Sequence, residues 1–194
     1  MGKTDIELVQ LAKATHDDDA FAELVRRHQA KLRAFLLRLA GDASAVDDIA
    51  QLSLIKAHRA ISEFQGGGSF RSWLFAIAYR EFLQQKRRDA AISRINETAA
   101  QAGLEHAAPS TDEMSLDLRD ALLRLSENER AALLLCDAVG FTHAEAAAAL
   151  GAPLGSVKSW VLRGREKMRK LLSPPTDGAS TIPQVKSKGA SYAR

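Results

Sequence analysis

The sequence predicts an all-α protein of two small helical domains joined by a flexible linker, and three observations support this. Residues 126–172 hold two helix starts and two helix-ending glycines, the pattern of a helix-turn-helix. Residues 19–88 hold apolar stripes that repeat every three to four residues. Between them, from about 89 to 109, the stripes fade. We therefore expect domains at 1–90 and 112–173, a linker at 91–111 and a disordered tail at 174–194.

The helix-turn-helix prediction rests on local signals for where helices begin and end. Two pairs have the spacing of a capping box: Ser126 with Glu129, and Thr142 with Glu145. Glycines suited to a left-handed helix end follow the two apolar runs: Gly140 and Gly151. Pro153 then suits the start of a third helix, where its missing N–H costs little.

The third of these helices divides its residues between two faces. At about 100° per residue, the apolar side holds Val157, Val161, Gly164, Met168 and Leu171. The other side holds Lys158, Ser159, Leu162, Arg163, Glu166, Arg169 and Lys170. A basic face opposite an apolar stripe is typical of a helix that lies in a DNA major groove, although a solvated surface helix can share it. For Trp160, at the edge of the stripe, we predict packing rather than base contact.

The composition indicates that the protein binds a polyanion through particular basic patches. The chain has 194 residues and a net charge of only +3, yet its pI is about 9.1. Residues 66–95 carry six basic and two acidic residues, so the positive charge is uneven. Local basic patches on a nearly neutral chain indicate nucleic-acid contact rather than a general coating of charge.

Cysteine usage and hydropathy indicate a cytoplasmic protein. The single cysteine, Cys136, lies in an apolar helical run, so we predict a buried thiol in a reducing compartment. There is no Cys/His spacing for zinc, and we expect no metal and no cofactor. The stretch MGKTDIELVQ lacks the apolar core of a signal peptide, and no apolar run approaches the roughly 20 residues of a membrane span.

The first domain begins with three predicted helices. Thr4 and Glu7 have capping-box spacing for a short helix that ends near Thr15. The aspartates at 17–19 then suit a helix start better than a metal site. The next helix is strongly periodic and ends at Gly41, with an apolar face made of Phe21, Leu24, Val25, His28, Leu32, Phe35, Leu36 and Leu39. Ser44 and Asp47 start another helix, which runs to about Ser62.

That last helix has a second face opposite its core stripe, formed by Asp48, Leu52, Ile55 and Arg59. Leu52 and Ile55 lie one turn apart and would be exposed apolar residues ringed by charge. Scattered surface leucines are common, but two on one face favour contact with a partner protein.

A glycine-rich loop, EFQGGGS at 63–69, precedes a helix that mixes aromatic and basic residues. Ser69 can cap this helix. Aromatic rings beside cations suit single-stranded nucleic acid, because bases stack on the rings while cations follow the phosphates. For Phe70 and Trp73 we favour a core position, and for the arginines nucleic acid. A later pair, Ser110 and Glu113, is predicted to cap the first helix of the second domain.

Together these stretches resemble the extracytoplasmic-function (ECF) sigma factors, the small two-domain members of the bacterial sigma-70 family. The resemblance runs from about residue 18 to 172. In the first domain it rests on DAFAELVRRHQAKL (19–32), AVDDIAQLSLIKAHRAI (45–61) and FQGGGSFRSWLFAIA (64–78). In the second it rests on LLRLSENERAALLL (122–135) and GAPLGSVKSWVLRGREKMRKLL (151–172).

The resemblance implies a sigma-2 bundle followed by a sigma-4 helix-turn-helix, with a role for each. Sigma-2 would bind the β′ clamp helices of core RNA polymerase through Asp47, Asp48, Gln51, Leu52 and Ile55. It would open the promoter −10 element with Gln65, Ser69, Arg71, Trp73, Arg80, Arg87 and Arg88. Sigma-4 would meet the β flap and read the −35 element with Ser156, Lys158, Ser159, Arg163 and Arg165.

The resemblance also implies regulation by an anti-sigma factor, which could tether the chain at the inner membrane face without direct membrane insertion, in a stress or envelope response. Five positions differ from what is common in the family: Leu52, Leu54, His58, Arg80 and Trp160. Two other functions therefore stay open, a sigma-like decoy that sequesters an anti-sigma factor and a polymerase-independent helix-turn-helix regulator. We expect no enzyme, since the histidines, the cysteine and the carboxylates form no nucleophile–base or metal pattern.

Overall fold

The computed structural model describes residues 2–15, 17–41, 43, 45–97 and 116–173, and the regular structure in these ranges is helical. The first half consists of α1 (Asp5–Thr15), α2 (Asp18–Ala40), α3 (Val46–Arg59), the short 3-10 helix η1 (Ile61–Glu63) and α4 (Phe70–Glu97). The second half consists of α5 (Leu116–Leu123), α6 (Glu127–Leu133), the π-helical turn η2 (Leu134–Ala138), α7 (His143–Leu150) and α8 (Leu154–Leu172).

The ends of α2 and the start of α4 follow the predicted signals. The Asp17 carboxylate caps α2 by accepting from the amide of Ala20 at 3.0 Å, which explains the acidic run without a metal. Gly41 ends α2 with a φ of 75°, in the left-handed region that suits glycine. The Ser69 hydroxyl accepts from the Ser72 amide at 3.1 Å at the start of α4.

The second half forms the predicted helix-turn-helix. Both capping boxes are present, Ser126 with Glu129 on α6 and Thr142 with Glu145 on α7. Gly151 ends α7 with a φ of 61°, and α8 follows directly. The π-helical turn η2 lengthens the end of α6, and its first two carbonyls, those of Leu134 and Leu135, accept from the amides of Val139 and Phe141.

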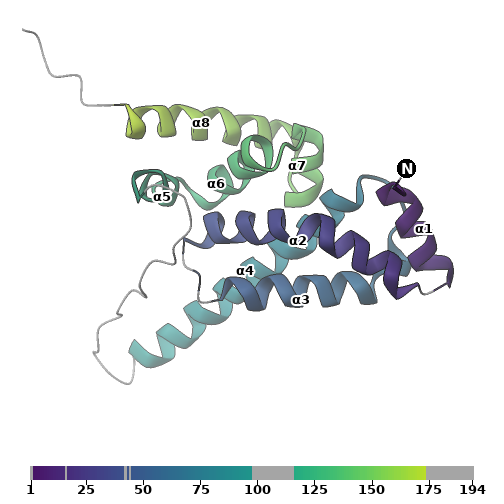
Figure 1. The fold of residues 1–194 in the computed structure, drawn as a ribbon. Helices are drawn as coiled ribbons and strands as arrows, with labels where there is room; N and C mark the ends of the chain where they lie inside the picture. The colour runs from purple at the N-terminus through teal and green to yellow at the C-terminus, as the bar shows by residue number, and fades with distance from the viewer. Residues whose placement is uncertain (1, 16, 42, 44, 98–115, 174–194) are drawn as a thin grey trace, which may run out of the picture.

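The two halves pack against each other around one buried cluster, which the sequence did not predict. Figure 1 shows α3 on one side of α2 and the second half on the other. Helix α7 lies against α4, and α5, α6 and η2 contact α2. Helix α8 packs on α5, α6 and α7 and is the layer farthest from α2 and α3.

Several predicted boundaries change. Helix α4 continues to Glu97, so residues 91–97 of the expected linker are helical. The N-cap of α3 is Ala45, without a side-chain hydrogen bond, while Ser44 lies outside the described residues. Leu171 is 38% exposed, so the prediction that it belongs to the buried α8 stripe is wrong. The Ser110–Glu113 cap, residues 98–111 of the linker and the tail also lie outside the described residues.

Candidate nucleic-acid and protein interfaces

The outward face of α8 presents the residues expected to read duplex DNA. Lys158 and Ser159 are exposed, Ser156 is half-buried, and the Ser159 hydroxyl donates to the Gly155 carbonyl at 3.0 Å. Val157, Val161, Gly164 and Met168 are buried on the opposite side, as predicted. Leu162 is 70% exposed in the middle of the basic face. The sequence analysis placed Leu162 on this face but gave it no role.

Arg163 is anchored from the side by a buried carboxylate. Its Nε donates to Oε1 of Glu129 at 3.1 Å, and the Lys167 ammonium donates to Oε2 of the same residue at 2.7 Å. Burial alone would raise the pKa of Glu129, but these donors and the capping contacts with Ser126 lower it to about 2. Arg163 keeps 53% of its side chain exposed, so it is both positioned and accessible.

Arg165 is directed differently from the rest of the predicted −35 set. Its Nε and Nη2 donate to the two carboxylate oxygens of Asp137 at 3.0 and 2.6 Å. These bonds raise the pKa of Arg165 and tie α8 to η2. The side chain is still 57% exposed. Arg165 could therefore contact a phosphate with its free N–H groups, or could exchange Asp137 for the phosphate.

The glycine-rich loop and the start of α4 form a hollow of about 320 Å³. Its wall contains four of the seven predicted −10 residues, Gln65, Ser69, Trp73 and Arg80, together with Ala148 of α7. Trp73 packs within an aromatic cluster, its ring centroid 5.3 Å from that of Phe64 and 5.8 Å from that of Phe70, with tilted ring planes. Phe70 is buried and Trp73 is partly buried, so both belong to the core, as favoured from the sequence.

The three remaining −10 candidates, Arg71, Arg87 and Arg88, fall in two places on α4. Arg80, Arg87 and Arg88 are exposed, with Arg87 and Arg88 two turns beyond Arg80. Arg71 is instead half-buried against the second half. Its guanidinium lies 4.5 Å from the ring centroid of Phe141 and donates to the carbonyls of Val139 and Gly140 at 3.3 and 3.4 Å.

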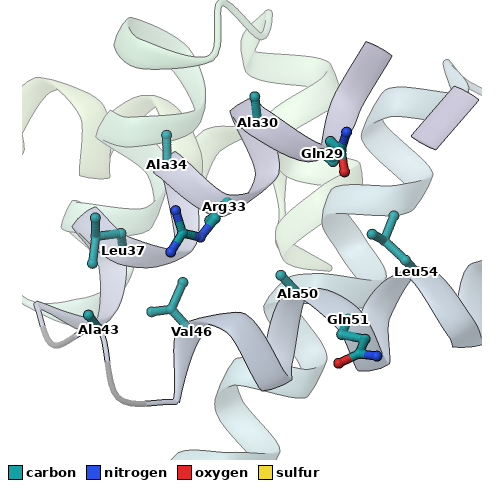
Figure 2. A pocket seen from close by; sticks show the side chains of 10 residues that line it. All are labelled: Gln29, Ala30, Arg33, Ala34, Leu37, Ala43, Val46, Ala50, Gln51 and Leu54. Carbon is teal, nitrogen blue, oxygen red and sulfur yellow. The ribbon is translucent and has the colours of Figure 1, made fainter. Parts of the chain in front are cut away.

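The predicted partner face lies on α3 and is wider than the sequence indicated. Leu52 and Ile55 are 37% and 41% exposed, and Asp47, Asp48 and Gln51 are exposed beside them. Figure 2 shows the groove between α2 and α3, about 790 Å³ in volume, with Gln51 and Leu54 on its α3 wall. The α2 wall contains Gln29, Ala30, Arg33, Ala34 and Leu37, residues outside the apolar face that periodicity predicted for this helix.

Charge surrounds this groove. Arg33 donates to the carboxylate of Asp47, with 3.1 Å between Nη2 and Oδ2, and this bond lowers the pKa of Asp47. Ile55 also borders a second hollow of about 780 Å³, lined by Phe21, Val25 and His58. The α2–α3 face is therefore apolar at its centre and charged at its rim, the usual anatomy of a protein interface.

Neither a metal-binding cluster nor a membrane-spanning helix occurs within the described ranges. No three His, Cys, Asp or Glu side chains there are grouped so that they could hold a metal ion. None of the described helices is both long and apolar enough to cross a bilayer. Cys136 is half-buried rather than buried as predicted, and its partial burial together with Asp137 raises the pKa of its thiol.

Comparison with known proteins gives matches to both halves. The family models for Sigma-70 region 2 and for Sigma-70, region 4 match residues 24–92 and 115–168. The ECF RNA polymerase sigma factor EcfG of Rhodopseudomonas palustris is 36% identical over 155 residues, covering 76% of this chain and 81% of the relative. The ECF RNA polymerase sigma-E factor of Salmonella typhimurium is 32% identical over 171 residues, covering 81% and 89%.

Two solved structures are also similar. The sigma factor RpoE of Bartonella quintana, in complex with the anti-sigma factor NepR, has a TM-score of 0.67 and 29% identity, covering 78% of this chain and 96% of that one. CnrH, in complex with the cytosolic domain of CnrY, has a TM-score of 0.64 and 26% identity, covering 87% and 96%. With a region 2 bundle, a region 4 helix-turn-helix and these relatives, the chain belongs to the ECF sigma factors of the sigma-70 family, non-enzymatic proteins that direct transcription initiation.

Proposed function

We propose that this chain recruits core RNA polymerase to promoters through three separate surfaces. The α2–α3 groove docks on polymerase, the loop and the start of α4 take the −10 strand, and α8 reads the −35 duplex. The observation that carries the proposal is that each surface has the chemistry its ligand needs. The α2–α3 groove is apolar with a charged rim. The loop and α4 combine arginines with a hollow, and α8 is a basic helix within the helix-turn-helix.

Polymerase docking is supported by the exposed apolar side chains of α3. Leu52 and Ile55 lie beside the groove that Leu37 and Leu54 line, so a partner helix laid against this face would contact both helices. Asp47 and Asp48 add negative charge at the start of α3. We propose the β′ clamp helices of polymerase as this partner, and the β flap as the partner of the second half.

Strand capture at the −10 element is a matter of binding rather than chemistry. Unstacking a base pair costs on the order of 1–2 kcal/mol, which contacts to the non-template strand must offset. Arg80, Arg87 and Arg88 supply exposed cations along α4 for the phosphates. The hollow beside Gln65 and Ser69 can receive an extruded base, as in other base-flipping systems.

Duplex recognition at the −35 element uses α8. Lys158 and Arg163 can donate to guanine or phosphate, and the Ser159 hydroxyl to a base edge. Leu162, exposed between them, offers an apolar contact for a thymine methyl group. The sequence pattern placed Leu162 on this face, and its 70% exposure adds it to the proposed −35 set.

We further propose that an anti-sigma factor controls this chain in the cytoplasm, where such a partner could hold it at the membrane. The similar structures of RpoE and CnrH are complexes, with the anti-sigma factor NepR and with the cytosolic domain of CnrY. The exposed apolar residues Leu52 and Ile55 would suit such a partner as well as polymerase. The inducing signal would then act on the partner and not on this chain.

The test is a pull-down of core RNA polymerase by the full chain, followed by run-off transcription on a genomic library. We expect polymerase to be retained and a discrete set of start sites to appear. Retention of polymerase without transcription would favour the decoy. Tight binding of the isolated chain to a duplex operator, with polymerase ignored, would favour the polymerase-independent regulator.

A further inference from the structure

Helix α1 packs beside the hollow that would receive the extruded base, although neither the sequence pattern nor the family match assigns it a function. Residues 5–15 precede the stretch 24–92 that matches Sigma-70 region 2. Leu8, Val9 and Ala12 are buried, and the helix contacts α2, η1 and α4. Helix α1 is therefore a packed part of the first half, and its two ends can be followed to the hollow.

The first turn of α1 is held to α2 by a buried histidine. His28 is 8% exposed, and its Nε2 lies 2.6 Å from Oδ2 of Asp5, while Arg27 donates to Oδ1 of Asp5 at 2.9 Å. The His28 ring lies 5.7 Å from the Phe70 ring between centroids. Phe70 begins α4 and packs with Trp73. The N-terminal end of α1 is thus connected, through one side chain, to the aromatic cluster beside the hollow.

The last turn of α1 reaches the glycine-rich loop directly. Lys13 is half-buried, and its ammonium donates to the Phe64 carbonyl at 2.6 Å, although the two residues are 51 positions apart in the chain. The Phe64 ring lies 5.3 Å from the Trp73 ring between centroids, and both residues line the hollow. Because the donor is charged, this hydrogen bond is stronger than one between neutral groups. One side chain of α1 therefore holds the residue at which the loop begins.

The loop itself is supported mainly at its two ends. Among the described residues, the nearest backbone hydrogen bonds on either side belong to the C-cap of η1 and to the first turn of α4. Residues 65–69 are exposed, and a Cβ placed at Gly66 or Gly67 would meet no atom within 4 Å. Glycine also has more backbone freedom than any other residue. The course of the loop therefore depends on the Lys13 contact at one end and on the Ser69 cap at the other.

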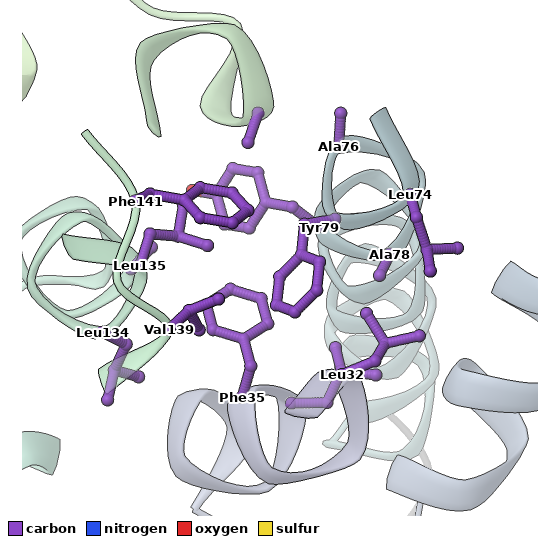
Figure 3. Close-up of a cluster of buried hydrophobic side chains, with 14 of the residues drawn as sticks. Leu32, Phe35, Leu74, Ala76, Ala78, Tyr79, Leu134, Leu135, Val139 and Phe141 are labelled. Carbon is purple, nitrogen blue, oxygen red and sulfur yellow. The ribbon is translucent and has the colours of Figure 1, made fainter. Parts of the chain in front are cut away.

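The opposite wall of the hollow is fixed by the core. Three residues of α4 contribute to this wall: Trp73, Ala76 and Arg80. Figure 3 shows the buried side of the same part of α4, where Leu74, Ala78 and Tyr79 belong to an apolar cluster shared with α2 and the second half. The position of the α4 wall is thus set by close packing. The width of the hollow then depends on where the loop lies.

We propose that Lys13 is a positioning residue for −10 recognition, which holds the Phe64 carbonyl and thereby sets which base the hollow accepts. The inference rests on the proposed function, because the shape of the hollow matters only if the hollow takes a promoter base. Lys13 acts through the loop and need not touch DNA. A displacement of about 1 Å is enough to break the hydrogen-bond distances on which base choice depends.

The test measures base discrimination at the −10 element by the full chain bound to core polymerase. Lys13→Met keeps the apolar stem of the side chain and removes its donor, whereas Lys13→Arg supplies a charged donor again. Templates carry a −10 element from the start sites found with the wild type, with each base of the non-template strand replaced in turn. We expect discrimination at one position to fall about tenfold in Lys13→Met and to recover in part in Lys13→Arg.

Lys3→Met is the matched control, because Lys3 is exposed just before α1 and loses the same charge. This control should discriminate between bases like the wild type. Salt dependence separates positioning from a direct phosphate contact. The slope of log affinity against log salt should be equal in Lys13→Met and the wild type, whereas a lost phosphate contact would reduce it by about one.

Unchanged base discrimination in Lys13→Met, or a reduced salt slope, would overturn the inference and leave the proposed function standing. Retention of polymerase and discrimination at the −35 element should not change, since Lys13 lies neither in the α2–α3 groove nor on α8. An equal loss at the −35 element would show general destabilisation and would also overturn the inference. If the wild type itself has no −10 preference, the proposed function fails, and this inference with it.

Discussion

Arg163 on α8 donates a hydrogen bond from Nε to Oε1 of Glu129 on α6, over 3.1 Å. Glu129 is 4% exposed and also caps its own helix, so one carboxylate sets the N-terminus of α6 and the direction of Arg163. The first helix of the helix-turn-helix therefore positions a side chain of the recognition helix.

Replacing Arg163 with alanine should weaken binding to promoters with a matched −35 element by about 1–3 kcal/mol if the guanidinium reads a guanine. The measurement is competition between matched and scrambled −35 templates for the polymerase complex. Lys170→Ala is the control, since Lys170 is 70% exposed and pairs only with Glu166 among the described contacts. An equal loss on both templates would show that Arg163 touches phosphate alone.

Replacing Glu129 with glutamine should destabilise the chain in a pH-dependent way. The folded pKa of Glu129, about 2, lies below its ordinary value of 4.5. The ionised carboxylate thus stabilises the fold above about pH 4.5, and this contribution is lost as pH falls towards 2. We expect a difference from the wild type of about 2 kcal/mol at pH 7 that shrinks below pH 4.5.

Urea unfolding of the full chain at several pH values measures this difference. Glu166→Gln is the control, because Glu166 is exposed and its contact with Lys170 lies within one helix. A difference at pH 3 as large as at pH 7 would mean that the Glu129 carboxylate acts by shape and not by charge.

Replacing Leu162 with alanine should abolish the preference for thymine over deoxyuridine at one position of the −35 element. An apolar side chain that is 70% exposed on a DNA-facing helix gains about 0.8 kcal/mol for each methyl-sized group it covers. Substituting deoxyuridine for each −35 thymine in turn should weaken wild-type binding at one position and leave Leu162→Ala unaffected there. If the wild type binds every deoxyuridine template equally well, Leu162 contacts no methyl group.

Replacing Leu52 and Ile55 with serine should weaken polymerase binding by about 1–2 kcal/mol for each residue, as expected for apolar side chains near the centre of an interface. Titration of fluorescently labelled chain with core polymerase measures the affinity. Ile6→Ser is the matched control, since Ile6 is 70% exposed on α1 and outside the groove. An equal loss in all three variants would indicate altered solubility rather than a docking surface.

The helix ends and apolar stripes could be predicted because their causes are local. A capping box spans four residues, so Ser126 with Glu129 is visible in the sequence. Similarly, three- and four-residue periodicity identified the buried face of α2. Lys158, Ser159 and Arg163 lie on the predicted outward face of α8, and Asp48, Leu52 and Ile55 on that of α3. Their ligands follow from the family resemblance and were not apparent from periodicity.

The packing of the halves could not be predicted from these patterns. Phe75 and Tyr79 fit an apolar stripe whether it is covered by the same domain or by another, so the sequence does not say which helix covers them. Partners such as Arg71 with Phe141, or Arg163 with Glu129, are far apart in the chain and are brought together only by the fold. The same holds for the α2 wall of the groove.

The Phe75 ring of α4 lies 5.3 Å from the Phe35 ring of α2 and 5.3 Å from the Phe141 ring of the second half, measured between centroids. One buried side chain is thus common to the packing of both halves. A substitution that leaves a void at Phe75 would loosen the two halves together, so part of their stability is held jointly.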